Sequence, residues 1–404
     1  MGTPKPDVDG AVTHTELPKE SDWVLGAPYV DKSLMRNTLA YHLYRQTGRY
    51  ASRWRHVELF LSDDGGASPA TYPRHYRGVY FVAEKIKRDA ARVAVRANHF
   101  RGEGDGDVTG GYIFKVDHMG QAEDTASFFR TSLTETRMIL VYPNEQQILP
   151  TQSTYIEGWI NSFESVLYGM DWLDAEHGYR RLIDVGSFVD YLLVAVELTN
   201  NPDALVASVY LSKEADELGG KMTIGPPWDF NYAFGNCVHK DAHVPRGWRF
   251  YYEAVGQGFG SLHWYSRLMQ DPEFSGEVKV RWAQLRAGPL GDARLQQYIC
   301  SEGERLAEPA ARNFAAWGTL GRWTWGCEFL KDPPYETYAD EVDALLYFVI
   351  QRAQWMDAHM SSIEQIRCGD EGCNHNFGAR PAIDYTPRES RACLQSCTWR
   401  GVRS

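Results

Sequence analysis

The sequence predicts an α+β fold, and three observations carry that prediction. Apolar residues recur with helical spacing early in the chain, alternate with a period of two over the next stretch, and return to helical spacing in the last third. No repeat of roughly 20–50 residues is visible, so the pattern is not that of a solenoid or propeller. With 404 residues, 43 % of them hydrophobic and 24 % charged, the chain can bury a large core.

The first predicted element is an amphipathic helix that follows a loose leader of residues 1–20. Met35, Leu39 and Leu43 recur at helical spacing, and Gly48 follows the last of them. Apolar residues at this spacing form one face of a helix, and glycine is common just beyond a helix end.

The pattern then changes to strands. Val57, Leu59 and Leu61 alternate with other residues, an Asp- and Gly-rich cluster turns the chain, and alternation resumes up to Glu84. Further short strands are expected at residues 92–95 and 111–116. We therefore expect an antiparallel sheet in this part of the chain.

Helical patterns dominate from residue 150 onward. Helices are expected at residues 150–170 and 187–199, and the second has a broad apolar face that should be buried. That helix ends at Asn200-Asn201-Pro202, because proline cannot continue it. A hairpin at residues 206–211 and 221–224 follows, and the chain is mostly helical after about residue 260.

The charge balance limits the possible partners. The chain has 42 Lys and Arg against 53 Asp and Glu, which gives a net charge of −11. Proteins that bind nucleic acids neutralise phosphates with clustered Lys and Arg, so we expect no nucleic-acid partner. Uninterrupted apolar runs, such as residues 191–196, are much shorter than the roughly 20 residues of a spanning helix. We expect no transmembrane segment.

Cysteines crowd the C-terminal tail, residues 366–404. Four of the seven lie there: Cys368, Cys373, Cys393 and Cys397. Their spacing matches no strong zinc pattern, although zinc stays an alternative, and we favour two disulfides that pin an irregular tail. Such disulfides would indicate an oxidising compartment.

Two carboxylates stand at the ends of predicted elements. Asp203 lies in the loop after the buried helix, and Asp229 follows the hairpin 26 positions later. Protein kinases present their catalytic base and their magnesium ligand in this order. Asp203 would then orient or deprotonate an acceptor hydroxyl, and Asp229 would hold the metal. The structural alternatives are an Asx turn at Asp203 and a strand-end cap at Asp229.

A kinase also needs a cation for the phosphates of its nucleotide. Lys115 ranks first, because its place in the strand is that of a cleft-facing residue, followed by Lys87 and Lys85. Glu84 is the expected acidic partner of such a lysine. Trp228 either lines an adenine site or packs in the core. A lysine at a sheet edge is the structural alternative for each cation.

Consecutive blocks of the chain resemble the CotH kinase family, named for spore coat protein H. Among them are RGVYFVAEKIKRDAARVAV, GGYIFKVD, SFVDYLLVAVELTNNPDALVASVYLSKE and GKMTIGPPWDFNYAFGN, and the similarity covers about residues 20–360. The combination of a GVY-x3-EKIK, an N-x2-D and a WDF block is specific. The resemblance implies an atypical protein-kinase-like domain at residues 21–365. Its N-terminal lobe, at about residues 21–145, would be an antiparallel sheet, and its C-terminal lobe, at about residues 146–365, would be larger and mostly helical.

The resemblance also implies a function. Members use ATP and Mg²⁺ to phosphorylate Ser or Thr of protein substrates in extracytoplasmic or coat settings, although no secretory signal is visible in the first 20 residues. Asp203 matches the catalytic aspartate and Asp229 the metal-binding one. Asn231 stands where many members have a second aspartate, and Ser208 stands where typical kinases place a magnesium-binding asparagine. Both are weaker magnesium ligands.

Two other classes remain open. A catalytically weak or inactive kinase-like protein, with a structural or binding role at a surface or coat, is favoured by Ser208, by Asn231 and by the lack of a glycine-rich nucleotide loop. A glycoside hydrolase is suggested by 13 Trp and many carboxylates. Nucleotide-dependent stabilisation without turnover would indicate the former, and cleavage of sugar chains the latter.

Overall fold

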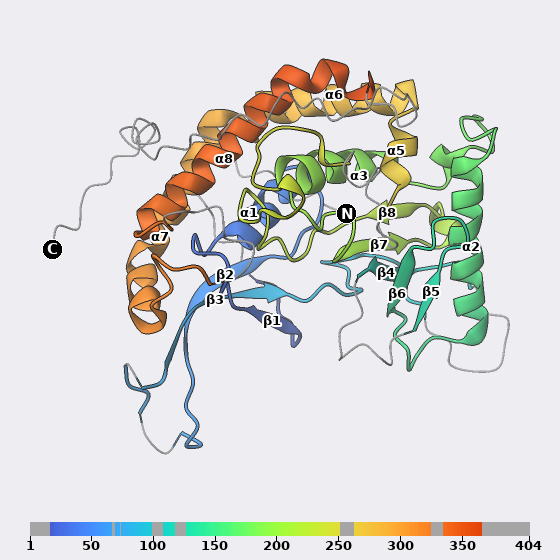
Figure 1. Ribbon diagram of the computed structural model, residues 1–404. Coiled ribbons are helices and arrows are strands. Elements are labelled where there is room, and N and C mark those ends of the chain that lie inside the picture. The colour runs from blue at the N-terminus through green and yellow to red at the C-terminus, as the bar shows by residue number, and fades with distance from the viewer. Residues whose placement is uncertain are drawn as a thin grey trace.

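The computed structural model describes residues 17–66, 69–72, 74–98, 108–117, 127–250, 262–324 and 334–365. The tail cysteines and most of the expected leader lie outside these residues. The described chain forms helices and two antiparallel sheets, which confirms the predicted α+β class (Figure 1).

The smaller sheet is built by the N-terminal part of the chain. Its strands are β1 (Trp23–Gly26), β2 (Trp54–Phe60) and β3 (Tyr76–Glu84), in the order β1-β3-β2. The predicted early helix is α1 (Arg36–Arg45), which lies between β1 and β2 in the chain. Asp31 fixes its start, because its carboxylate accepts hydrogen bonds from the Ser33 and Arg36 backbone N–H groups at 3.0 and 2.7 Å.

The larger sheet has five antiparallel strands in the order β5-β6-β4-β7-β8. They are β4 (Tyr112–Val116), β5 (Phe128–Arg130), β6 (Arg137–Tyr142), β7 (Val209–Lys213) and β8 (Met222–Ile224). The predicted hairpin is β7 and β8, and β4 pairs with both β6 and β7. This sheet therefore takes strands from both sides of residue 145, and the division into lobes at that residue stays a prediction.

Three strands were not predicted, and one predicted strand was wrong. β1, β5 and β6 are only three to six residues long, so they carry little alternation of their own. Residues 92–95 form no strand and contribute only an isolated bridge between Arg88 and Val93.

The buried helix predicted at residues 187–199 is made of two parts. The α-helix α3 (Val185–Asp190) continues into the π-helix η3 (Tyr191–Leu198), whose residues are all buried. Asp184 caps α3 by accepting a hydrogen bond from the Ser187 backbone N–H at 3.1 Å. In Figure 1, α3 lies between the five-stranded sheet and the C-terminal helices. The end of η3 thus points the following loop toward the sheet.

The remaining helices cover the sheets. α2 (Pro150–Tyr168) stands beside β5 and β6, while α6 (Pro272–Ala287), α7 (Asp292–Trp317) and α8 (Tyr338–His359) form the outer layer, with the short α5 (Trp264–Leu268) leading into it (Figure 1). α7 also packs on β3, where the Val79 N–H donates to Asn313 Oδ1 at 3.0 Å. Within the described ranges no helix is both long and apolar enough to cross a membrane.

One apolar cluster joins α1, both sheets, η3 and the C-terminal helices. Phe114 of β4 and Leu211 of β7 face each other in the sheet, and both are fully buried. Burying a side chain of this kind stabilises a fold by about 1.5–3 kcal/mol. The segments that carry Asp203 and Asp229 therefore leave a rigid, well-packed base.

Candidate functional site

Asp203 lies in the loop directly after η3. Its N–H donates to Asn201 Oδ1 at 3.3 Å, and its carbonyl accepts hydrogen bonds from the N–H groups of Val206 and Ala207 at 2.9 and 3.0 Å. The first of these bonds forms an Asx turn closed by the Asn201 side chain, with Asp203 as its third residue. The half-buried Asp203 carboxylate, in contrast, has no hydrogen bond to any described residue. The turn holds this carboxylate in place and leaves it available.

Asp229 follows β8 and is held by α1. Its backbone is left-handed, with φ of 62°, and its N–H lies 3.5 Å from the Tyr41 hydroxyl. The next N–H, of Phe230, donates to Asn37 Oδ1 at 2.5 Å. A left-handed conformation is costly for most residues but tolerated by aspartate, so these two contacts help to fix an unusual turn. Asp229 itself is exposed to solvent.

The electrostatics show that Asp203 and Asp229 are neighbours. Protein atoms around the solvent-reaching Asp229 carboxylate reduce its hydration and raise its pKa, and the negative charges of Asp117 and Asp203 raise it further, to about 6. Like charges disfavour ionisation of one another when they lie close together. The fold has thus brought three carboxylates into one region.

Asp117 was missed in the sequence. It follows β4 at the second position after Lys115, and its Oδ2 lies 2.9 Å from Lys115 Nζ. Residues two apart in an extended chain point to the same side, so the Lys-x-Asp spacing in GGYIFKVD was the available signal. The side chains of β4 divide between two apolar clusters: Ile113 packs in one, and Tyr112, Phe114 and Val116 pack in the other.

The expected pairing of Glu84 with a lysine is wrong. Glu84 is fully buried, and its carboxylate binds Arg53 through bonds of 2.5 and 2.9 Å, with Arg92 at 3.5 Å. Arg53 reaches it because the Glu84 N–H is bonded to the Arg53 carbonyl beside the sheet. Lys115 pairs with Asp117 instead.

The other predicted cations stand apart from this pairing. Lys87 binds Asp22 and Glu20 at 2.5 and 3.1 Å, and these acids lie just before β1. Lys85 is exposed. The structure brings neither lysine into a contact with Asp203 or Asp229, and Lys115 is the predicted cation whose partner belongs to the carboxylate cluster.

Three further predicted residues lie beside the two aspartates in the chain. Trp228 stacks on Tyr41 with ring centroids 5.8 Å apart, and it packs against the core. Ser208 has a left-handed backbone with φ of 57°, and the Asn231 carbonyl accepts a hydrogen bond from Asn236 at 2.8 Å. Among the described residues, no group of three or more Asp, Glu, His or Cys is arranged to hold a metal ion.

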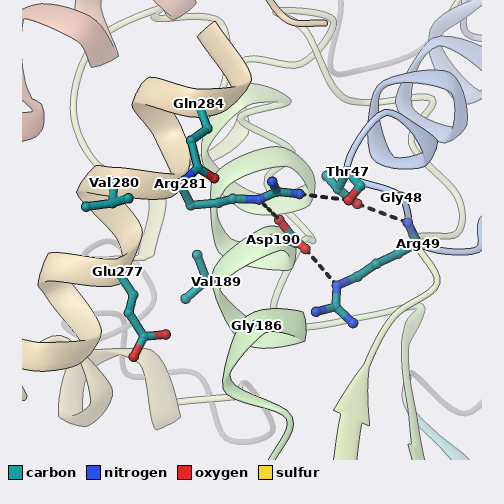
Figure 2. A pocket seen from close by; sticks show the side chains of 10 residues that line it. All are labelled: Thr47, Gly48, Arg49, Gly186, Val189, Asp190, Glu277, Val280, Arg281 and Gln284. Atoms are coloured by element: carbon teal, nitrogen blue, oxygen red, sulfur yellow. Dashed lines mark hydrogen bonds and ion pairs between the residues drawn. The ribbon is translucent and has the colours of Figure 1, made fainter. Parts of the chain in front are cut away.

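A separate pocket of about 630 Å³ lies between the end of α1, α3 and α6 (Figure 2). Asp190 stands at its centre and binds Arg49 and Arg281, each through an Nε hydrogen bond of 2.7 Å. Glu277 lines it as well and pairs with Arg180. Its opposite charges compensate each other, and none of its lining residues belongs to the predicted site.

The arrangement of an aspartate loop after a buried helix, and of a second aspartate after a hairpin, is that of a kinase-like protein. A family model described as CotH kinase protein matches residues 7–356, so the chain belongs to the CotH kinase family. No curated protein matches the chain.

Proposed function

We propose that the protein is an ATP- and Mg²⁺-dependent kinase that phosphorylates Ser or Thr of a protein substrate. The observation that supports this best is the grouping of Asp117, Asp203 and Asp229: reduced hydration is the main cause that raises the pKa of Asp229 to about 6, and the charges of the other two carboxylates add to it. Carboxylates grouped in this way favour a bound cation, and magnesium prefers oxygen ligands of this kind.

The residues have distinct roles in this proposal. Asp229 would hold the metal, assisted by the Asn231 amide oxygen and the Ser208 hydroxyl, and bound magnesium supplies charge that neutralises the phosphates. Lys115 would exchange its contact with Asp117 for a phosphate oxygen. Asp203 would accept a hydrogen bond from the acceptor hydroxyl and take its proton as the oxygen bonds to the γ-phosphorus, while the bond from that phosphorus to the β–γ bridging oxygen breaks and ADP leaves.

We also propose an extracellular, cell-surface or coat-associated setting. Cys237 and Cys300 are both disulfide-bonded. Disulfides persist mainly in oxidising compartments, which agrees with this proposal.

The test compares the wild-type protein with Asp203→Asn and Asp229→Asn, using radiolabelled ATP and a mixed Ser/Thr peptide library. We expect transfer to fall by about 10²–10⁴-fold in Asp203→Asn, since a catalytic base contributes about that factor. Affinity for Mg·ATP, measured by calorimetry, should be kept in Asp203→Asn and weakened in Asp229→Asn. Glu277→Gln, in the separate pocket, is the control and should behave as wild type. Equal transfer by all four proteins would contradict the proposal.

A second candidate function is a kinase-like surface or coat protein that binds nucleotide without turnover. Ser208 and Asn231 favour it, because a hydroxyl and an amide supply no charge to a metal. If Mg·ATP raises the melting temperature of the wild-type protein while no peptide is phosphorylated, this second function is the correct one.

A further inference from the structure

A buried ion cluster lies beneath the Asp203 loop. We call it the Glu197 network, and its members are Glu197 of η3, Asn200, Arg249 and Arg352 of α8, each at most 2 % exposed. The Glu197 carboxylate accepts hydrogen bonds from Arg352 Nη2 at 2.7 Å and from the backbone N–H groups of Arg249 and Phe250 at 2.8 Å each. A buried carboxylate with this many donors is firmly fixed.

The network joins two stretches that are distant in sequence. One is the loop of residues 199–208, which carries Asp203, and the other is the segment of residues 234–250, which follows Asp229. The Arg249 Nε donates to Asn200 Oδ1 at 2.9 Å, and the Asn200 amide donates to the carbonyls of Ala242 and Val244 at 3.1 and 2.9 Å. Asn200 of the Asp203 loop therefore makes three hydrogen bonds to the segment of residues 234–250.

Two further hydrogen bonds join the same loop to the same segment. The Phe234 N–H donates to the Thr199 carbonyl at 2.7 Å, and Lys240 Nζ donates to the carbonyl of Pro202 at 3.1 Å, one residue before Asp203. Asn200 itself has a left-handed backbone with φ of 48°, a conformation in which asparagine is favoured over most side chains. The loop is thus bent at Asn200 and bonded to the segment on both sides of the bend.

In protein kinases, the segment after the metal-binding aspartate is often ordered only when an added phosphate pairs with arginine. Here Glu197 supplies an anion from within the chain, and its carboxylate binds the Arg352 guanidinium and the backbone N–H of Arg249. The segment of residues 234–250 is therefore bonded, at its end, to a carboxylate of the chain itself.

We propose that Asn200 and Arg249 are positioning residues. Arg249 is bonded to Glu197 and Asn200 is bonded to Arg249, and together they fix the position of the Asp203 carboxylate relative to the segment that follows Asp229. The inference rests on the proposed kinase function for its effect on turnover. Its structural part, the coupling of the two segments, does not.

The test uses Asn200→Ala, because it removes no charge and leaves the bonds of Glu197 to Arg352 and to the Arg249 backbone N–H in place. Asn313→Ala is the matched control. Asn313 of α7 is also a buried amide, and it binds the backbone N–H of Val79 in β3, far along the chain from either segment. Hydrogen exchange is measured on peptides covering residues 199–208 and 234–250. Phosphate transfer is measured as kcat and as KM for ATP.

We expect exchange to quicken in both segments together in Asn200→Ala, and in neither segment in Asn313→Ala. The kcat should fall by about tenfold or more in Asn200→Ala, because a small misplacement of a catalytic group can cost up to about 10²-fold. The KM for ATP should stay within about threefold, since Lys115 and Asp229 are untouched. If Asn200→Ala merely failed to fold, its melting temperature would fall and exchange would quicken throughout the described chain, not in these two segments alone.

Unchanged exchange in the two segments, or an unchanged kcat in Asn200→Ala, would overturn the positioning role. If the wild-type protein transfers no phosphate at all, the proposed function fails, and the exchange result still decides whether the Glu197 network couples the two segments.

Discussion

The protein holds two groups of carboxylates in contrasting ways. In the pocket between α1, α3 and α6, Asp190 is nearly buried and lies between the guanidinium groups of Arg49 and Arg281 (Figure 2). At the end of β8, Asp229 reaches solvent beside two other carboxylates, and its pKa is raised. Opposite charges that satisfy one another hold elements together. Like charges that lie close together favour the binding of a cation, and this difference is why we propose the second group as the functional one.

The largest effect that separates the two groups is on stability. We expect Asp190→Ala to lower the free energy of unfolding by about 2–3 kcal/mol, below the about 3–5 kcal/mol of a fully buried pair because both arginines are partly exposed. Asp229→Asn removes a repulsion and should leave stability equal or higher. Urea unfolding of both variants measures this. A larger loss in Asp229→Asn would reverse the assignment of the two groups.

The next effect is the pH dependence of metal binding. Because the pKa of Asp229 is raised to about 6, its carboxyl is largely protonated below that pH, and a proton must leave before magnesium binds. We expect the Mg²⁺ affinity of the ATP-bound protein to rise by about tenfold per pH unit up to about pH 6 and to level off above it. Calorimetric titrations between pH 5 and pH 8 measure this, and an affinity independent of pH over that range would contradict it.

The same pKa has a consequence for stability without metal. The fold favours the protonated form of Asp229, so this group makes the metal-free protein less stable as pH rises from about 4 toward 6. Paired carboxylates act in the opposite direction, which is why Asp229→Asn must be compared with wild type at each pH.

A smaller effect isolates Asp117. Of the two neighbouring carboxylates that raise the pKa of Asp229, Asp117 has the larger effect. Asp117→Asn removes its charge, so the pH midpoint of magnesium binding should move to lower pH. The midpoint should not return to the pKa of an ordinary aspartate, because reduced hydration, the main cause of the raised Asp229 pKa, remains. An unchanged midpoint would mean that Asp117 lies too far from the cation to matter.

The smallest effect is expected in the pocket. Glu277→Gln breaks a pair whose two side chains are 26 % and 40 % exposed. Pairs of this kind contribute about 0–1 kcal/mol, so the melting temperature should change little. A loss comparable to that of Asp190→Ala would show that the pocket depends on Glu277 as well.

Local patterns in the sequence were enough to predict the long elements and to propose the two aspartates as candidates. Alternation and helical spacing identified α1, β2, β3, β4, α2 and the β7–β8 hairpin, because each signal lies within one element. The order of the five-stranded sheet was not predictable in this way, since β4 pairs with β7 about 95 positions later along the chain.

The details of the site depend on contacts between distant residues. Glu84 pairs with arginines because β3 lies beside Arg53, and nothing in the EKIK block indicates that. The left-handed backbone of Asp229 is fixed by α1, and the Glu197 network joins α8 to a loop some 150 positions earlier. Sequence reasoning therefore reached the candidate aspartates but not the residues that hold them.

The most direct test of the account is a crystal structure with Mg²⁺ and a non-hydrolysable ATP analogue. We predict that Asp229 contacts the metal, that Lys115 has left Asp117 for a phosphate oxygen, and that Asp203 faces the γ-phosphate. A nucleotide bound in the pocket around Asp190, or a triphosphate that contacts neither Asp229 nor Lys115, would contradict it.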